Sequence, residues 1–172
     1  SPPLGMLKAE TSVIIALPSA PRAVPGSRAV TAEATAWLLA ARSGVLSRMD
    51  AAAESVSIST VDSFGTALHW AAAGDHRKAI EWLITRGVSP RARNAAGQTA
   101  LHVAAHAGFP DSLSVLLSNG GDGGSADRRG LTPLHYASAG CHVAALKLLL
   151  ADSSGCRSLS LKSIDDKTAL HY

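Results

Sequence analysis

Apolar residues return along this chain at a constant interval of 33 positions. Three sets of aliphatic residues keep this interval: Ile80, Leu113 and Leu146; Leu83, Leu116 and Leu149; and Ile84, Leu117 and Leu150. Within each segment they have the spacing i, i+3, i+4, which places them on one face of a helix. A helix that recurs at a fixed distance of this length is typical of a solenoid, in which similar units stack and bury their apolar faces.

A four-residue phrase precedes each of these helices. It reads Thr66-Ala67-Leu68-His69 and returns at residues 99–102, 132–135 and 168–171. The first three threonines are 33 residues apart, and the fourth follows after 36. We place the three extra residues in a loop within 152–161, because surface loops accept insertions at little cost. Each unit is therefore predicted to contain a short helix, a second apolar helix and a hairpin-like connector.

With these elements the chain resembles the ankyrin repeat family, whose Thr-Pro-Leu-His-x-Ala core appears almost unchanged from Thr132 to Ala137. The resemblance covers about residues 31–172. It implies an all-α fold, an ankyrin-like helical repeat solenoid with short hairpin-like connectors. It also implies a role in binding proteins, while the fold alone leaves the partner open.

We divide the chain into a leader and an array. Residues 1–28 hold five of the eight prolines and are expected to form a flexible Pro-rich leader. The array comprises a divergent capping repeat at 29–60, full repeats at 61–93, 94–126 and 127–164, and the start of a further, truncated repeat at 165–172. Its glycine-rich connector, 120–125, is expected to be mobile, and we expect the protein to continue beyond Tyr172.

Composition narrows the possible partners. Aromatic residues make up only 4% of the chain, so the core must consist mainly of Ala, Leu, Val and Ile. The formal net charge of +3 is too small to favour nucleic-acid binding. The apolar run Val13–Leu17 is far shorter than the roughly 20 residues that span a bilayer. We therefore expect no nucleic acid and no membrane within this chain, and a monomer.

The two cysteines, Cys141 and Cys156, have neither a metal-site spacing nor that of a disulfide framework. A cytoplasmic or nuclear, hence intracellular and reducing, setting fits them best. We expect them to be structural thiols, because a free cysteine usually behaves as a small buried hydrophobe.

The histidines invite a metal hypothesis, which the repeat geometry disfavours. His69, His102 and His135 are equivalent, and stacked helices lie about 10 Å apart, whereas zinc binds nitrogen at about 2.0 Å. The resemblance implies instead that these side chains bond backbone groups of the neighbouring repeat. His76 and His142, ahead of the second helices, are expected to be partly exposed. No catalytic or phosphate-binding motif is found, so we expect no enzyme activity, no cofactor and no metal.

The family's variable positions lie on the connector tips and on the inner face of the first helices. On this sequence they give the candidate partner-binding residues Phe64, Arg93, Gln98, His106, Arg128, Arg129 and Leu131. Arginine and aromatic side chains are favoured interface anchors, which suggests a protein or peptide partner of acidic character; surface solvation alone is the other interpretation of the arginines. Trp70, Val103 and Tyr136 share one equivalent position and are expected to pack between helices. The alternative function is a recognition domain of a longer ankyrin-repeat enzyme, such as an acyltransferase, kinase or ubiquitin-ligase component.

Overall fold

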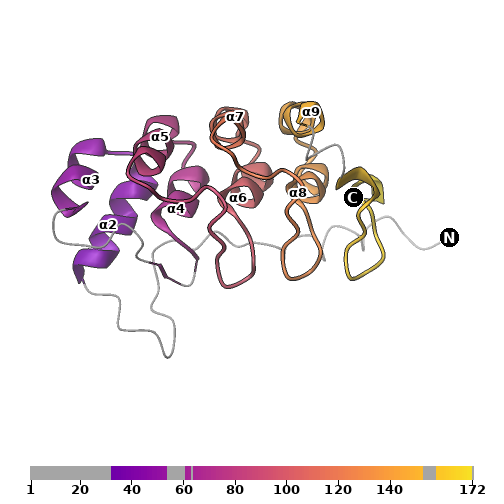
Figure 1. Ribbon diagram of the computed structural model, residues 1–172, viewed down its shortest axis with the longest axis horizontal. Helices are drawn as coiled ribbons and strands as arrows, with labels where there is room; N and C mark the ends of the chain where they lie inside the picture. The colour runs from indigo at the N-terminus through magenta and orange to yellow at the C-terminus, as the bar shows by residue number, and fades with distance from the viewer. Residues whose placement is uncertain (1–31, 54–60, 63, 153–157, 172) are drawn as a thin grey trace, which may run out of the picture.

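The computed structural model describes residues 32–53, 61–62, 64–152 and 158–171. Eight α-helices lie in this part of the chain as four consecutive pairs (Figure 1). The first helices of the pairs are α2 (Ala32–Ser43), α4 (Ala67–Ala73), α6 (Ala100–Ala107) and α8 (Pro133–Ala139). The second helices are α3 (Leu46–Ala53), α5 (Arg77–Thr85), α7 (Pro110–Ser118) and α9 (Val143–Ala151). Two 3₁₀ helices follow, η2 (Ser158–Ser160) and η3 (Ala169–His171).

The pairs stack side by side, with the second helices along one side of the molecule and the hairpin-like connectors projecting from the other (Figure 1). The described residues form no strand; one isolated bridge joins Val61 to Thr66. The predicted all-α solenoid is therefore confirmed. The predicted Pro-rich leader, the run Val13–Leu17 and Cys156 lie outside the described residues.

The 33-residue period is visible in the helix boundaries. Helices α5, α7 and α9 each begin and end 33 residues after the one before. Pro110 is the first residue of α7, where its missing N–H has no intrahelical partner to lose. Gly87, with φ of 93°, lies just beyond α5 and adopts the left-handed conformation that ends a helix. The three extra residues lie between Ala151 and the next connector, which agrees with the loop predicted for them.

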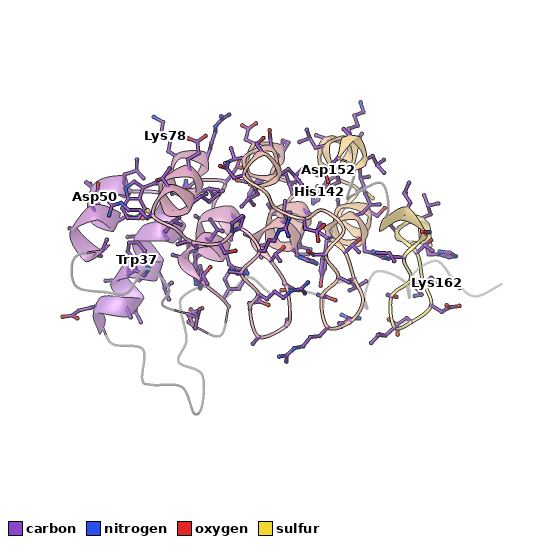
Figure 2. All side chains as sticks on the ribbon, viewed as in Figure 1. Trp37, Asp50, Lys78, His142, Asp152 and Lys162 are labelled. Atoms are coloured by element: carbon purple, nitrogen blue, oxygen red, sulfur yellow. The ribbon has the colours of Figure 1, made fainter. Side chains whose placement is uncertain are left out.

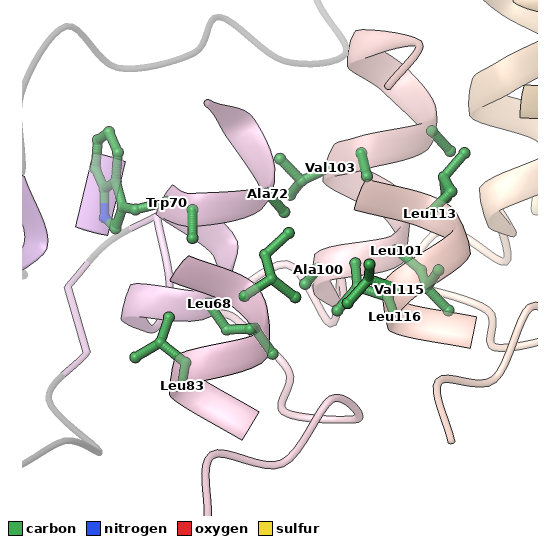
Figure 3. Close-up of a cluster of buried hydrophobic side chains, with 14 of the residues drawn as sticks. Leu68, Trp70, Ala72, Leu83, Ala100, Leu101, Val103, Leu113, Val115 and Leu116 are labelled. Atoms are coloured by element: carbon green, nitrogen blue, oxygen red, sulfur yellow. The ribbon is translucent and has the colours of Figure 1, made fainter. Parts of the chain in front are cut away.

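The row of leucines that the period predicts is fully buried. Leu83, Leu116 and Leu149 have exposed fractions of 0%. Figure 3 shows Leu83 and Leu116 on successive repeats, with Leu68 and Leu101 of the preceding first helices in the same cluster. Alanines fill much of the remaining core, so neighbouring helices approach closely. The interior is therefore one continuous layer between repeats.

Each first helix begins after a threonine that is bonded to the histidine three residues later. The backbone N–H groups of Thr66, Thr99 and Thr132 donate to the Nδ1 atoms of the histidines that follow, at 3.1, 3.0 and 3.1 Å. This bond satisfies a backbone group at the helix start, where no intrahelical partner exists. The Thr-x-x-His phrase is thus a helix-initiation signal.

The glycine-rich connector after α7 is hydrogen-bonded rather than slack. The carboxylate of Asp122 accepts bonds from the N–H of Gly124 and the hydroxyl of Ser125, at 3.0 and 3.1 Å. Gly121 N–H donates to Leu116 O at 2.9 Å. Adding a Cβ to Gly121 would bring it within 2.7 Å of that carbonyl, so close packing explains this glycine.

Candidate partner-binding surface

Each connector is a five-residue turn closed by its first residue. The N–H groups of Asn94, Asp127 and Ser163 donate to the carbonyls four residues later, at 2.9, 2.9 and 2.8 Å. The corresponding turn at Asp62 closes on Gly65, three residues later, at 3.0 Å. The tighter turn follows from one fewer residue between Gly65 and the next threonine in the sequence.

Side chains at the base of the turns hold the backbone from inside. Asp127 Oδ1 accepts bonds from the N–H groups of Arg129 and Leu131, at 2.8 and 2.9 Å. Asn94 Oδ1 does the same for Ala96 and Gln98, at 3.0 and 2.9 Å. Because these N–H groups are already bonded, each tip is a rigid turn whose second and third residues point outward.

The outward residues of three successive turns form what we call the tip row. Its members are Ala95, Ala96, Arg128, Arg129, Ile164 and Asp165. Arg128 N–H donates to Ala96 O at 3.1 Å, and Ile164 N–H donates to Arg129 O at 2.9 Å. The tips are thus joined through their backbones as well as through the helices beneath, and their side chains have fixed relative positions.

Three of the predicted contact residues are buried, which corrects the expectation that a partner reaches them. Phe64, Gln98 and Leu131 have exposed fractions of 7%, 6% and 2%. The Phe64 ring packs on Trp70 with centroids 4.5 Å apart. Gln98 Nε2 donates to the Tyr136 hydroxyl at 2.8 Å. These residues support the tips from beneath instead of forming their surface.

The predicted arginines are exposed, but they differ in their partners. Arg93 Nη1 donates to the carbonyls of Gly97 and Ala126, at 2.8 and 2.7 Å, and so ties two connectors together. Arg129 Nη2 lies 3.8 Å from Asp165 Oδ2. Within the described part of the chain Arg128 has no ion-pair partner. Arg128 therefore carries the tip charge that is most available to a partner.

The predicted helix-face residue, His106, is half-buried near the end of α6. Its ring meets Tyr136 edge to face with centroids 5.9 Å apart. Its carbonyl is bonded to the imidazole Nε2 of His142 at 2.9 Å. The residue thus has structural contacts and retains one accessible side.

The three phrase histidines link each repeat to the next connector, as the resemblance implied. The Nε2 atoms of His69, His102 and His135 lie 3.0, 3.1 and 3.3 Å from the carbonyls of Gln98, Leu131 and Lys167. Because Nδ1 accepts the threonine N–H, the neutral ring carries its proton on Nε2 and donates it to the carbonyl. These carbonyls belong to the closing residues of the turns, so the histidines also set the height of the tips.

Burial keeps these rings neutral. It lowers the pKa of His69 and of His135, and it lowers the pKa of His102 from 6.5 to about 4. Desolvation is the largest cause in each case, because a charged imidazolium is costly in an apolar interior. Protonation would also place a hydrogen on Nδ1, opposite the threonine N–H.

A second pair of histidines bonds in the opposite direction along the stack. The Nε2 atoms of His76 and His142 lie 2.8 and 2.9 Å from the carbonyls of Arg42 and His106 in the preceding repeats. Both are half-buried, as expected. Each ring lies over two glycines: a Cβ on Gly44 or Gly74 would approach the His76 ring to 2.4 or 2.5 Å, and Gly108 and Gly140 stand in the same relation to His142.

A buried polar network anchors the tip of the 127–164 repeat, and sequence reasoning did not find it. The Tyr136 hydroxyl donates to Asp127 Oδ2 at 2.8 Å and accepts from Gln98 Nε2 at 2.8 Å. Burial and then the bond to Asp127 raise the pKa of Tyr136 above its usual value. Trp70, Val103 and Tyr136 are all buried, as predicted. The missed signal is the acidic or amide residue that opens each turn: Asp62, Asn94 and Asp127.

Other candidate chemistry finds little support. Among the described residues no three His, Cys, Asp or Glu side chains gather as a metal site. No helix in the described ranges is long and apolar enough to cross a membrane. A groove of about 730 Å³ on α2 and α3 is lined by Glu33, Arg48 and mostly small residues, without a histidine or cysteine.

Cys141 is exposed, which contradicts the expected buried thiol. It lies in the turn between α8 and α9, with a positive φ of 55°. The residues at the same place in the earlier repeats, Asp75 and Gly108, have φ of 56° and 74°. This turn faces water, so its side chains are not part of the core.

The stacked helix pairs, the buried leucine row and the connector tips define a helical repeat solenoid. The chain belongs to the ankyrin repeat family: a family model of ankyrin repeats in three copies matches residues 37–127, and one of ankyrin repeats in many copies matches residues 110–150. No curated protein matches the chain. Ankyrin repeats are generally protein–protein interaction modules, and the family is typically non-catalytic.

Proposed function

We propose that this chain is a non-catalytic module that binds a protein or peptide segment along the tip row and the adjoining end of α6. The observation that carries this proposal is the exposed Arg128 at the centre of a backbone-linked row of tips. A rigid row loses little conformational entropy on binding, so contacts made there are not offset by ordering the loop. We also propose a monomer in a reducing, intracellular setting.

The charge of the surface favours an acidic partner. Arg91 and Arg93 use backbone carbonyls as hydrogen-bond acceptors. Like Arg128, they have no carboxylate within ion-pair distance in the described ranges. Three positive charges therefore remain uncompensated near the tips. Salt screens exposed charges beyond about 10 Å, so a partner must contact this surface to benefit from them.

The test is a selection from a displayed library of random twelve-residue peptides, carried out on the intact chain. We expect enriched peptides that contain Asp or Glu. Their affinity, measured by fluorescence anisotropy, should fall at least about tenfold with Arg128→Glu combined with Arg129→Glu, because each lost charged hydrogen bond is replaced by repulsion. The melting temperature should stay unchanged, since both side chains are exposed.

Lys78→Glu combined with Lys147→Glu is the matched control. Both lysines are exposed on second helices, and Figure 2 shows Lys78 on the side of the molecule away from the connectors. The control makes the same change in net charge and should keep the affinity. Failure to enrich any peptide, or equal losses in the two double variants, would overturn the proposal. No observation in the described residues favours the alternative of a recognition domain within a longer enzyme.

A further inference from the structure

The charges of the tip row cancel in pairs, with one exception. Arg129 faces Asp165 at 3.8 Å, and Lys162 Nζ lies 2.8 Å from Asp166 Oδ1. These pairs are exposed, so each contributes little to stability. They nevertheless neutralise the two arms of the surface around Arg128. A carboxylate arriving at the row therefore meets one uncompensated positive charge instead of a uniform basic patch.

The next tip carries an exposed apolar side chain. Ile164 occupies the same place in its turn as Arg128 and Ala95 do in theirs, and 71% of it is exposed. Its backbone N–H is bonded to Arg129 O at 2.9 Å, so the position of the side chain relative to Arg128 is fixed. On the other side of Arg128, Ala95 offers neither charge nor bulk. Recognition on this row is therefore one-sided.

The spacing of the tips sets the spacing in a ligand. Packed helices of neighbouring repeats lie roughly 8 to 10 Å apart. An extended chain advances about 3.3 to 3.6 Å per residue. Two ligand side chains on neighbouring tips are therefore three residues apart, because about three residues cover the distance between tips.

We propose that the tip row binds an extended segment of a partner protein that places a carboxylate on Arg128 and, three residues away, an aliphatic or aromatic side chain on Ile164. This inference rests on the proposed function and makes it specific. Arg128 supplies a charged hydrogen bond, and Ile164 supplies apolar area that is removed from water on binding. Arg129, already matched by Asp165, contributes to the rigidity of the row and not to the choice of ligand.

The experiment measures the affinities of the most enriched twelve-residue peptides for single variants of the chain. Arg128→Gln should weaken binding about tenfold or more, through loss of a charge-assisted hydrogen bond. Ile164→Ser should weaken it about fivefold to tenfold, through loss of apolar burial. The matched control, Arg129→Gln combined with Asp165→Asn, removes a charged pair at constant net charge and should change the affinity by less than about twofold.

The enriched sequences provide an independent readout. They should pair an acidic residue with an apolar one at a separation of three, and moving the apolar residue to a separation of five should cost as much as Ile164→Ser does. Enriched peptides without this pairing, or an unchanged affinity with Ile164→Ser, would overturn this inference while leaving the proposed function intact. An absence of enriched peptides would overturn both. Thermal melts of each variant exclude loss of folding as the cause.

Discussion

Acidification should destabilise this protein through one buried ring, His102. Its Nδ1 accepts the Thr99 N–H at 3.0 Å, its Nε2 lies 3.1 Å from Leu131 O, and it is fully buried between two repeats. Desolvation lowers its pKa from 6.5 to about 4. The folded protein therefore binds fewer protons than the unfolded chain between these two pH values, and stability must fall as the pH falls through this window.

The magnitude follows from the shift. One pKa unit corresponds to about 1.4 kcal/mol, so the contribution that is complete above pH 6.5 should decrease by about 3 kcal/mol on reaching pH 4. A change of this size is a large fraction of the 5 to 15 kcal/mol, roughly, that stabilises a typical domain. The pKa values of His69 and His135 are lowered too, so their contributions have the same sign.

The assay is urea unfolding followed by circular dichroism at several pH values between 7 and 4. Carboxylates also titrate in this range, so the parent is compared with His102→Gln, whose amide has no titrating proton and keeps a donor for Leu131 O. Between pH 7 and pH 4 the parent should lose about 3 kcal/mol more than the variant. Parallel curves for the two proteins would refute the assignment of this loss to His102.

Three further substitutions test the turns and the polar network. Cys141→Gly should raise the unfolding free energy by about 1 kcal/mol in thermal melts, because a non-glycine residue there has φ of 55°. Gly108→Ala should lower it by about 2 kcal/mol or more, since its Cβ would meet the His142 ring at 2.4 Å; a melt like that of the parent would contradict this. Tyr136→Phe should cost about 1 to 3 kcal/mol in urea unfolding, because Asp127 loses a buried donor; an unchanged midpoint would show that water replaces it.

The sequence was sufficient for the parts of the fold that every repeat shares. The leucine row and the histidine bonds recur because each repeat presents the same environment to its neighbour, so a period in the sequence becomes a period in space. Burial of Leu83, Leu116 and Leu149 follows from their period alone. The bond from His102 to Leu131 followed from the family resemblance.

The exposure of individual connector residues was predicted less well, because it depends on the direction of single side chains within a five-residue turn. Gln98 and Leu131 close their turns and point inward, although they flank outward-pointing residues. The signal for this direction is in the sequence: Asn94 and Asp127 open equivalent turns, and their side chains bond the N–H of the closing residue. A search for that pattern would have placed the tips correctly.

Cys141 illustrates a second kind of missed signal. Taken alone, a free cysteine is usually buried. Its equivalents Asp75 and Gly108 are residue types that tolerate positive φ, which indicates a turn at this place in every repeat. The pairing of His76 and His142 with glycines has the same origin, since ring and backbone occupy one space; in the intervening repeat the equivalent residue is Phe109.

The tip row is the part of the solenoid in which side chains can vary without changing the backbone. The same turn carries Ala95 and Ala96 in one repeat, Arg128 and Arg129 in the next, and Ile164 and Asp165 in the third. The closing hydrogen bonds of these turns differ by only 0.1 Å. Binding specificity can therefore change at these positions while the turn-opening residues and the histidines beneath keep the geometry constant, which is why Arg128 and Ile164 are the residues in which a choice of partner is expressed.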